Sequence, residues 1–163
     1  RPTHHVAPLD VAWAEHRVMP GSGRWLHGGT FSLVLGRNEP FFFQLPDRAR
    51  LLGMQLDGQL KVPREVQPGV FQISPAGGQR SYELSLWWDF PDESDLTARP
   101  DLTRVRFRGA EDYPELCTLH APGEYVLASA GTGFDPVGAV RAAAFGSCCV
   151  ASAFSAVCTR RSN

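Results

Sequence analysis

The chain has 163 residues, 43% of them hydrophobic and 20% charged, and a formal net charge of −1. This composition excludes an intrinsically disordered protein and is typical of a single globular domain. A net charge so close to zero gives no overall attraction to nucleic acid or to an anionic membrane, so we expect neither as a partner.

The N-terminal part predicts a tail and then a strand. Residues 1–8 are interpreted as a flexible tail, and residues 9–163 as one β-sandwich domain. Leu9, Val11 and Trp13 alternate with smaller or polar residues, which predicts a first strand that begins there.

Two phenylalanine-rich segments predict the next strands. Phe31, Leu33 and Leu35 alternate with polar residues, the pattern of a strand with one apolar face. Residues 41–43 are three consecutive phenylalanines, which predicts a short strand buried on both faces.

The clearest local pattern is a hairpin over residues 51–62. Apolar side chains at every second position from Leu52 to Leu56 are predicted to share one face of its first strand. Asp57 and Gly58 then form a two-residue turn, because glycine tolerates a positive φ.

Residues 82–88 alternate more cleanly than any other segment. The apolar face runs from Tyr82 to Trp88, and Trp87 falls on the opposite, polar face. Trp87 is therefore either exposed, as a contact surface for sugar rings or protein, or covered by the polar loop expected over residues 89–101.

A basic stripe is predicted further along the chain. Small or apolar residues alternate there with arginines: Thr103, Val105 and Phe107 with Arg104, Arg106 and Arg108. The three arginines share one face of a predicted strand. They can bind a phosphate, a carboxylate or an acidic partner, pair with acidic residues of the chain, or discourage edge-to-edge aggregation. We rank an acidic protein surface or internal pairing first.

Glycine and proline turns separate about eight predicted strands, at the spacing typical of a sandwich or barrel. The expected fold is therefore all-β, an antiparallel β-sandwich or jelly-roll-like domain. Residues 142–158 carry no charge and precede Arg160 and Arg161, a pattern that resembles a membrane stop-transfer signal. This run is short and rich in small residues, so a C-terminal helix or final core strands are expected and a membrane span is not.

The cysteines do not indicate a metal site. Cys117, Cys148, Cys149 and Cys158 match no zinc template. Because a chain of this length does not need a disulfide for stability, we expect reduced thiols, a slight indication of an intracellular location.

No catalytic residue, metal or cofactor is assigned from the sequence. Cys117 and His120 come nearest to a nucleophile–base pair, but a spacing of three places them on opposite faces of a strand. His27, just before two glycines, is interpreted as a turn residue. The acidic residues from Asp89 to Asp95 are interpreted as a solvated loop and not as a calcium site.

We therefore expect a non-enzymatic binding or interaction domain that recognises a protein partner, or a second copy of itself, through a β-sheet face. The expected binding residues are Trp87, Arg104, Arg106 and Arg108. Two alternatives remain open: a carbohydrate-binding module that uses Trp87, and a small hydrolase with a site at Cys117 and His120.

Overall fold

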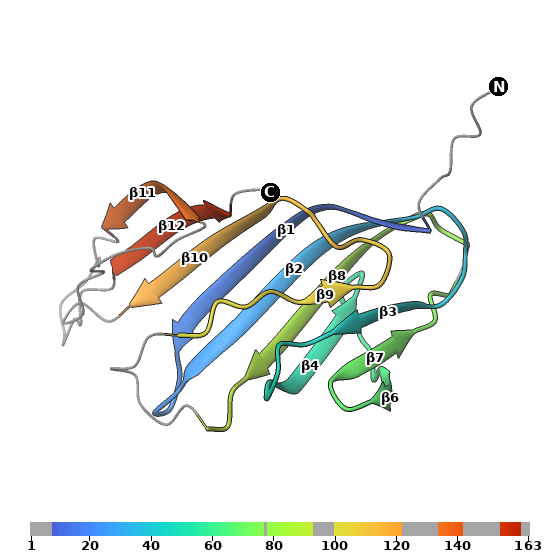
Figure 1. The fold of residues 1–163 in the computed structure, drawn as a ribbon, viewed down its shortest axis with the longest axis horizontal. Helices are drawn as coiled ribbons and strands as arrows, with labels where there is room; N and C mark the ends of the chain where they lie inside the picture. Colours follow the sequence, from blue (N-terminus) through green and yellow to red (C-terminus); the bar gives the residue numbers. More distant parts are fainter. Residues whose placement is uncertain (1–7, 77, 93–99, 122–133, 142–153, 161–163) are drawn as a thin grey trace.

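The computed structural model describes residues 8–76, 78–92, 100–121, 134–141 and 154–160, and no helix occurs among them. The described residues form twelve strands (Figure 1). In chain order they are β1 (Leu9–Pro20), β2 (Trp25–Leu35), β3 (Phe41–Gln44), β4 (Arg50–Leu56), β5 (Gln59–Leu60), β6 (Arg64–Gln67), β7 (Val70–Ile73), β8 (Ser81–Asp89), β9 (Arg106–Phe107), β10 (Glu115–Ala121), β11 (Phe134–Arg141) and β12 (Phe154–Arg160).

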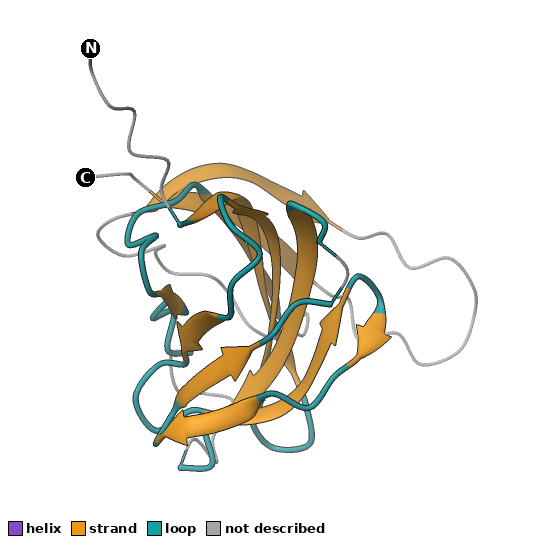
Figure 2. Cartoon of the chain, turned by 90° about the vertical axis from the view of Figure 1, so that its right-hand side faces the viewer, coloured by secondary structure: helices purple, strands orange, loops and turns teal. Residues whose placement is uncertain are grey.

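These strands form two sheets that face each other (Figure 2). The large sheet has eight strands in the order β11-β12-β10-β1-β2-β8-β4-β5, and the small sheet has four in the order β6-β7-β3-β9. β1 and β10 pair in parallel, and the other neighbouring pairs in the described part are antiparallel. In Figure 1 the small sheet lies in front of the right-hand part of the large sheet, and β10 to β12 lie at its left-hand end.

The hydrophobic core lies between the two sheets. On β8, every second side chain from Tyr82 to Trp88 is buried, as the alternation predicts. Phe43 and Phe107 enter the core from the small sheet, and the ring of Phe107 lies 5.0 Å from that of Phe31 in an edge-to-face contact. Such a contact adds about 0.5–1.5 kcal/mol beyond the burial of area. The predicted all-β, sandwich-like fold is confirmed.

The chain has more strands than the eight or so predicted, because several are too short to show hydrophobic alternation. β5 and β9 have two residues each, and the four residues of β6 are all exposed. The parallel pairing of β1 with β10 was also not predicted, since alternation within a strand carries no information about its neighbour.

The predicted hairpin is present between β4 and β5. Leu56 pairs with Gln59 across the turn. Asp57 and Gly58 have φ angles of 50° and 73°. Two successive positive φ angles are the geometry of a type I′ turn, which matches the twist of the flanking strands.

Two β-bulges turn apolar side chains outward, contrary to prediction. The register of β1 against β2 shifts between Val11 and Trp13, and that of β4 against β8 shifts between Leu51 and Gly53. An inserted residue breaks the alternation of facing along the strand. Trp13 and Leu52 are 45% and 49% exposed. Leu52 therefore does not share the face of Met54 and Leu56 as predicted, and Trp13 does not follow Leu9 and Val11 into the core.

Three other predictions are corrected by the structure. Phe42 is only partly buried, because its outer side is covered by the guanidinium of Arg108 and not by another layer of core. His27 is buried within β2 and is not a turn residue, since that strand already begins at Trp25. Asp89 is the buried last residue of β8 and is not part of a solvated loop.

The described C-terminal segments are strands. β11 pairs with β12, and β12 pairs with β10. Residues 154–158 of the uncharged run therefore form strand, as one of the two predictions had it, whereas residues 142–153 lie outside the described residues. The predicted tail up to residue 7 also lies outside them. Within the described ranges, no helix is long and apolar enough to cross a membrane.

Candidate functional site

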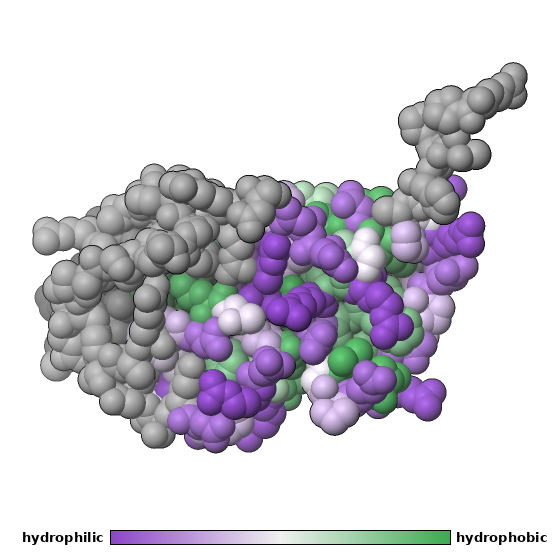
Figure 3. All heavy atoms as spheres, viewed as in Figure 1, coloured by the Kyte–Doolittle hydropathy of each residue, from purple (hydrophilic) through white to green (hydrophobic). Residues whose placement is uncertain are grey.

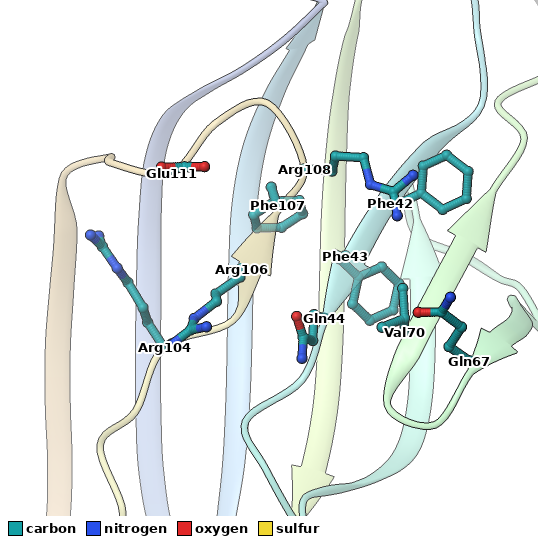
Figure 4. A pocket seen from close by; sticks show the side chains of 10 residues that line it. All are labelled: Phe42, Phe43, Gln44, Gln67, Val70, Arg104, Arg106, Phe107, Arg108 and Glu111. Carbon is teal, nitrogen blue, oxygen red and sulfur yellow. The ribbon is translucent and has the colours of Figure 1, made fainter.

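The three arginines of the predicted stripe line one pocket, which we call the arginine pocket. It has a volume of about 590 Å³ and lies over β9, β3 and the β6–β7 hairpin (Figure 4). Its polar lining is Arg104, Arg106, Arg108, Gln44, Gln67 and Glu111, and its apolar lining is Phe42, Phe43, Val70 and Phe107. On this side of the molecule, strongly hydrophilic residues lie beside hydrophobic ones (Figure 3).

Strand alternation positions these arginines. Val105 and Phe107 are both 1% exposed and anchor the segment in the core. Arg106, between them, therefore points outward, and it lies opposite Gln44 in the register of β9 with β3. The regular strand is only two residues long, but the alternation of burial extends over residues 104–108.

One of the three arginines has a carboxylate partner among the described residues. Arg104 donates from Nη2 to Oδ1 of Asp112 at 2.9 Å and from Nη1 to the carbonyl oxygen of Tyr113 at 3.3 Å. The guanidinium of Arg108 lies 4.4 Å from the ring centre of Phe42. Arg106 is exposed and forms no hydrogen bond or ion pair through its side chain with the described part of the chain. Internal pairing therefore explains Arg104 and not the other two.

The pocket lining combines guanidinium groups, side-chain amides and apolar surface. Guanidinium groups bind carboxylates with two parallel hydrogen bonds and are weakly hydrated for a cation. Gln44 and Gln67 add amide donors and acceptors, and Phe42 and Val70 add partly buried apolar surface. Glu111 is the one carboxylate among the lining residues, so the lining carries an excess of positive charge.

Trp87 lies on the outer face of the large sheet and is 38% exposed. Its neighbours in the register are both glycines, Gly28 on β2 and Gly53 on β4. A Cβ atom on Gly28 would lie 3.7 Å from Cδ1 of the indole, and one on Gly53 would lie 3.6 Å from Cε3. The indole therefore occupies the space between two positions that have no side chain.

The structure separates the two predicted binding surfaces. Trp88 points into the core, so Trp87 points away from the small sheet. The arginine pocket lies on the small sheet. The structure thus brings the three arginines together and places Trp87 on the opposite side of the molecule, so the four residues do not form one site.

Cys117 and His120 both lie on β10. Cys117 is buried and His120 is partly buried. Residues three apart on a regular strand face opposite ways, so this arrangement offers no support for a nucleophile–base pair. In the register, Cys117 lies opposite Cys158 of β12. In the described part of the chain, no group of three or more histidine, cysteine or acidic side chains is placed to hold a metal ion.

A buried histidine pair was not predicted from the sequence. Nε2 of His16 lies 3.1 Å from Nδ1 of His27, and Nδ1 of His16 lies 3.9 Å from Oε1 of Glu115. The Trp88 ring lies 5.0 Å from that of His16 and 5.6 Å from that of His27. The only available signal was that each histidine follows the alternation of the buried face of its strand.

Burial and charge shift two pKa values near this pair. Burial lowers the pKa of His27 to about 4, and the charges of Asp101 and then Asp89 oppose this only in part. Burial alone would raise the pKa of Asp89. The hydrogen bonds and charges of Arg50, and then of Arg24, outweigh burial and hold the Asp89 pKa below its ordinary value. At neutral pH the His27 imidazole is therefore neutral and the Asp89 carboxylate is ionised.

No protein-family model and no curated protein sequence matches the chain. Several solved structures are similar to the chain, and each of the three described next aligns with 94% of the chain's residues. The M1 zinc metallopeptidase from Deinococcus radiodurans matches with 13% identity and a TM-score of 0.55. Legionella pneumophila aminopeptidase A, solved with aspartic acid, matches with 8% identity and a TM-score of 0.60. Yeast LTA4 hydrolase, solved with bestatin, matches with 10% identity and a TM-score of 0.51.

These matches concern the fold, because the sequence identities are low. The chain spans only part of each matched protein: 39% of the Deinococcus enzyme, 20% of the Legionella enzyme and 29% of the yeast enzyme. Its two-sheet fold therefore resembles a portion of longer chains, among them a zinc metallopeptidase.

Proposed function

We propose that this chain is a non-enzymatic interaction domain that binds an acidic polypeptide segment in the arginine pocket. The observation that carries this proposal is that the side chains of Arg106 and Arg108 have no carboxylate partner among the described residues. No carboxylate of the described residues neutralises either guanidinium, and both line a pocket with apolar surface. A segment that presents an acidic side chain next to an apolar one matches both features.

The structural matches support a role within a larger assembly. In the three solved proteins described above, the matched part accounts for 20% to 39% of the chain. We infer that this chain likewise acts beside a catalytic polypeptide of the metallopeptidase type, in the same chain or as a separate subunit. Its contribution would be binding, and the partner would contribute the chemistry.

Electrostatics sets the expected strength of this binding. An exposed ion pair contributes about 0.2–1 kcal/mol, and a pair partly withdrawn from water contributes more. Two available guanidinium groups therefore favour modest affinity, and they accelerate association more than they prolong the complex. Binding should weaken as the salt concentration rises, because screening acts on these exposed charges.

The test is an isothermal calorimetric titration of the complete chain with a peptide of alternating Glu and Leu, which measures the binding affinity. A matched peptide with Gln in place of Glu removes the charge and keeps the shape. We expect the Glu peptide to bind and the Gln peptide to bind at least about tenfold more weakly. Arg106→Ala should weaken binding of the Glu peptide about fivefold or more.

Arg37→Ala is the matched control. Arg37 is exposed between β2 and β3 and does not line the pocket. Its Nη1 lies 3.8 Å from Oε1 of Glu39. Its loss removes the same net charge and should leave binding nearly unchanged. Equal binding of the two peptides, or full binding by Arg106→Ala, would contradict the proposal. A dimer of the chain that requires Arg106 would instead identify a second copy as the partner.

A further inference from the structure

The outer face of the large sheet carries two exposed tryptophans, Trp87 on β8 and Trp13 on β1. Trp87 lies opposite Gly28, which lies opposite Arg17 on the same strand as Trp13. With a strand spacing of about 4.8 Å and a rise of about 3.3 Å per residue, the two tryptophan Cα atoms lie about 16 Å apart. The two indoles therefore mark the ends of a diagonal across this face.

The two residues directly opposite Trp87 carry no side chain. Both cross-strand neighbours are glycines, and even an added Cβ atom would only reach ordinary van der Waals contact with the ring. On most sheets the adjacent strands place side chains against such a ring. The indole, which is 38% exposed, therefore meets no side chain from these two cross-strand positions.

The surface between the two indoles is polar. The outward positions there are occupied by Glu15, Arg17, Thr30, Ser32, Glu83 and Ser85. Arg17 forms a bidentate pair with Glu15. Its Nε donates to Oε1 of Glu15 at 2.6 Å, and its Nη2 donates to Oε2 at 2.7 Å. The face thus alternates aromatic surface with groups that donate and accept hydrogen bonds.

This arrangement matches a carbohydrate better than a protein partner. A sugar ring has an apolar C–H face that stacks on an aromatic ring, and a rim of hydroxyls that needs hydrogen bonds. The central part of a protein interface instead groups aromatic and aliphatic side chains together. One sugar ring covers one indole, so a ligand that contacts both must be an extended chain.

We propose that this face binds an extended β-1,4-linked polysaccharide, with one sugar ring stacked on Trp87 and another on Trp13. The hydroxyls of the intervening sugars hydrogen-bond to the polar residues between them. This site is independent of the arginine pocket, because the two lie on opposite sides of the molecule. An experiment can therefore contradict polysaccharide binding on this face without contradicting peptide binding in the arginine pocket, and the reverse also holds.

The experiment measures depletion of the complete chain by microcrystalline cellulose and by chitin, together with titration by cellohexaose and chitohexaose. Amylose is the comparison, because its α-1,4 linkages coil the chain. We expect binding to a β-1,4-linked glycan well above binding to amylose. Trp87→Ala and Trp13→Ala should each weaken it about tenfold, and Trp87→Phe should retain most of it.

Two further variants test whether the contact is specific. Leu60→Ala removes an exposed apolar side chain on β5, away from both indoles, and Arg106→Ala alters the opposite side of the molecule. Both should bind like the unaltered chain. Absence of binding to every β-1,4-linked glycan, or full binding by both tryptophan-to-alanine variants, would overturn the proposal. So would an equal loss in Leu60→Ala, which would indicate non-specific adhesion.

Discussion

His16 and His27 are in direct contact on the inner face of the large sheet, with Nε2 of His16 3.1 Å from Nδ1 of His27 and each residue 1% exposed. A hydrogen bond between two imidazoles needs an N–H on one ring and a lone pair on the other. Two protonated rings cannot form it, because both nitrogens would carry hydrogen. The contact therefore links the stability of the β1–β2 pairing to the protonation of these rings.

Stability is predicted to fall as the pH is lowered from 6.5 to about 4. The pKa of His27 is about 4 in the folded chain against 6.5 for the free side chain, so the unfolded chain takes up a proton first. This difference corresponds to about 3 kcal/mol of unfolding free energy over the whole interval. Urea unfolding at a series of pH values measures it. If His27→Gln shows the same loss between these pH values, another group is responsible.

Asp89→Asn is predicted to destabilise the fold by about 1–3 kcal/mol. The Asp89 carboxylate is buried and accepts hydrogen bonds from Arg24 at 3.1 Å and from Arg50 at 3.1 and 2.7 Å. Arg50→Ala should cost less, because Arg24 still pairs with the carboxylate. Urea unfolding at pH 7 compares the variants, and an Asp89→Asn variant as stable as the unaltered chain would refute the prediction.

The Asp89 contribution should have its own pH window. Because the pKa of Asp89 is held below its ordinary value of 3.8, its stabilisation is present above that value. It is lost as the pH falls through the lower pKa of the folded chain. The window therefore lies below that of His27, and the two effects separate in one pH series.

Strand alternation predicted much of the fold because it is a local property. The face from Tyr82 to Trp88 was predicted correctly, since each side chain there obeys a period of two. The facing of Leu52 was predicted wrongly, because the bulge in β4 inserts a residue that hydrophobic alternation does not indicate. Strand order was not predictable, since it depends on pairing between distant segments.

The same distinction applies to the candidate sites. The arginines at 104, 106 and 108 share a pocket because they lie on one short segment, where alternation fixes their side. The placement of Trp87 on the opposite side of the molecule required knowledge of how the sheets pack. The His16–His27 pair joins two strands, and no spacing in the sequence indicates their register.

Gly29→Ala is predicted to destabilise the fold by about 1–3 kcal/mol through overpacking. A Cβ atom at Gly29 would lie 2.6 Å from Cε2 of Phe31 and 3.1 Å from Cζ3 of Trp88, and both rings are fully buried. Gly28→Ala is the matched control on the other face, where the nearest contact is 3.7 Å, and should change stability by less than about 0.5 kcal/mol. Equal thermal unfolding of the two variants would contradict this packing.

Gly58→Ala is predicted to cost about 1 kcal/mol. Gly58 has a φ angle of 73°, and nothing lies within 4 Å of an added Cβ atom, so the cost is conformational and not steric contact with a neighbour. Urea unfolding measures the loss. Gln59→Ala, at the next position, keeps the turn glycine and should have little effect. A Gly58→Ala variant of unchanged stability would mean that the type I′ turn does not persist in solution.

Amide chemical-shift mapping tests most directly whether the arginine pocket binds an acidic segment. The complete chain, labelled with nitrogen-15, is titrated with the Glu–Leu peptide. The proposed function predicts that the largest shift changes occur at residues 104–108, Gln44 and Gln67, which line the pocket. Changes confined to the outer face around Trp87, or no changes at millimolar peptide, would contradict it.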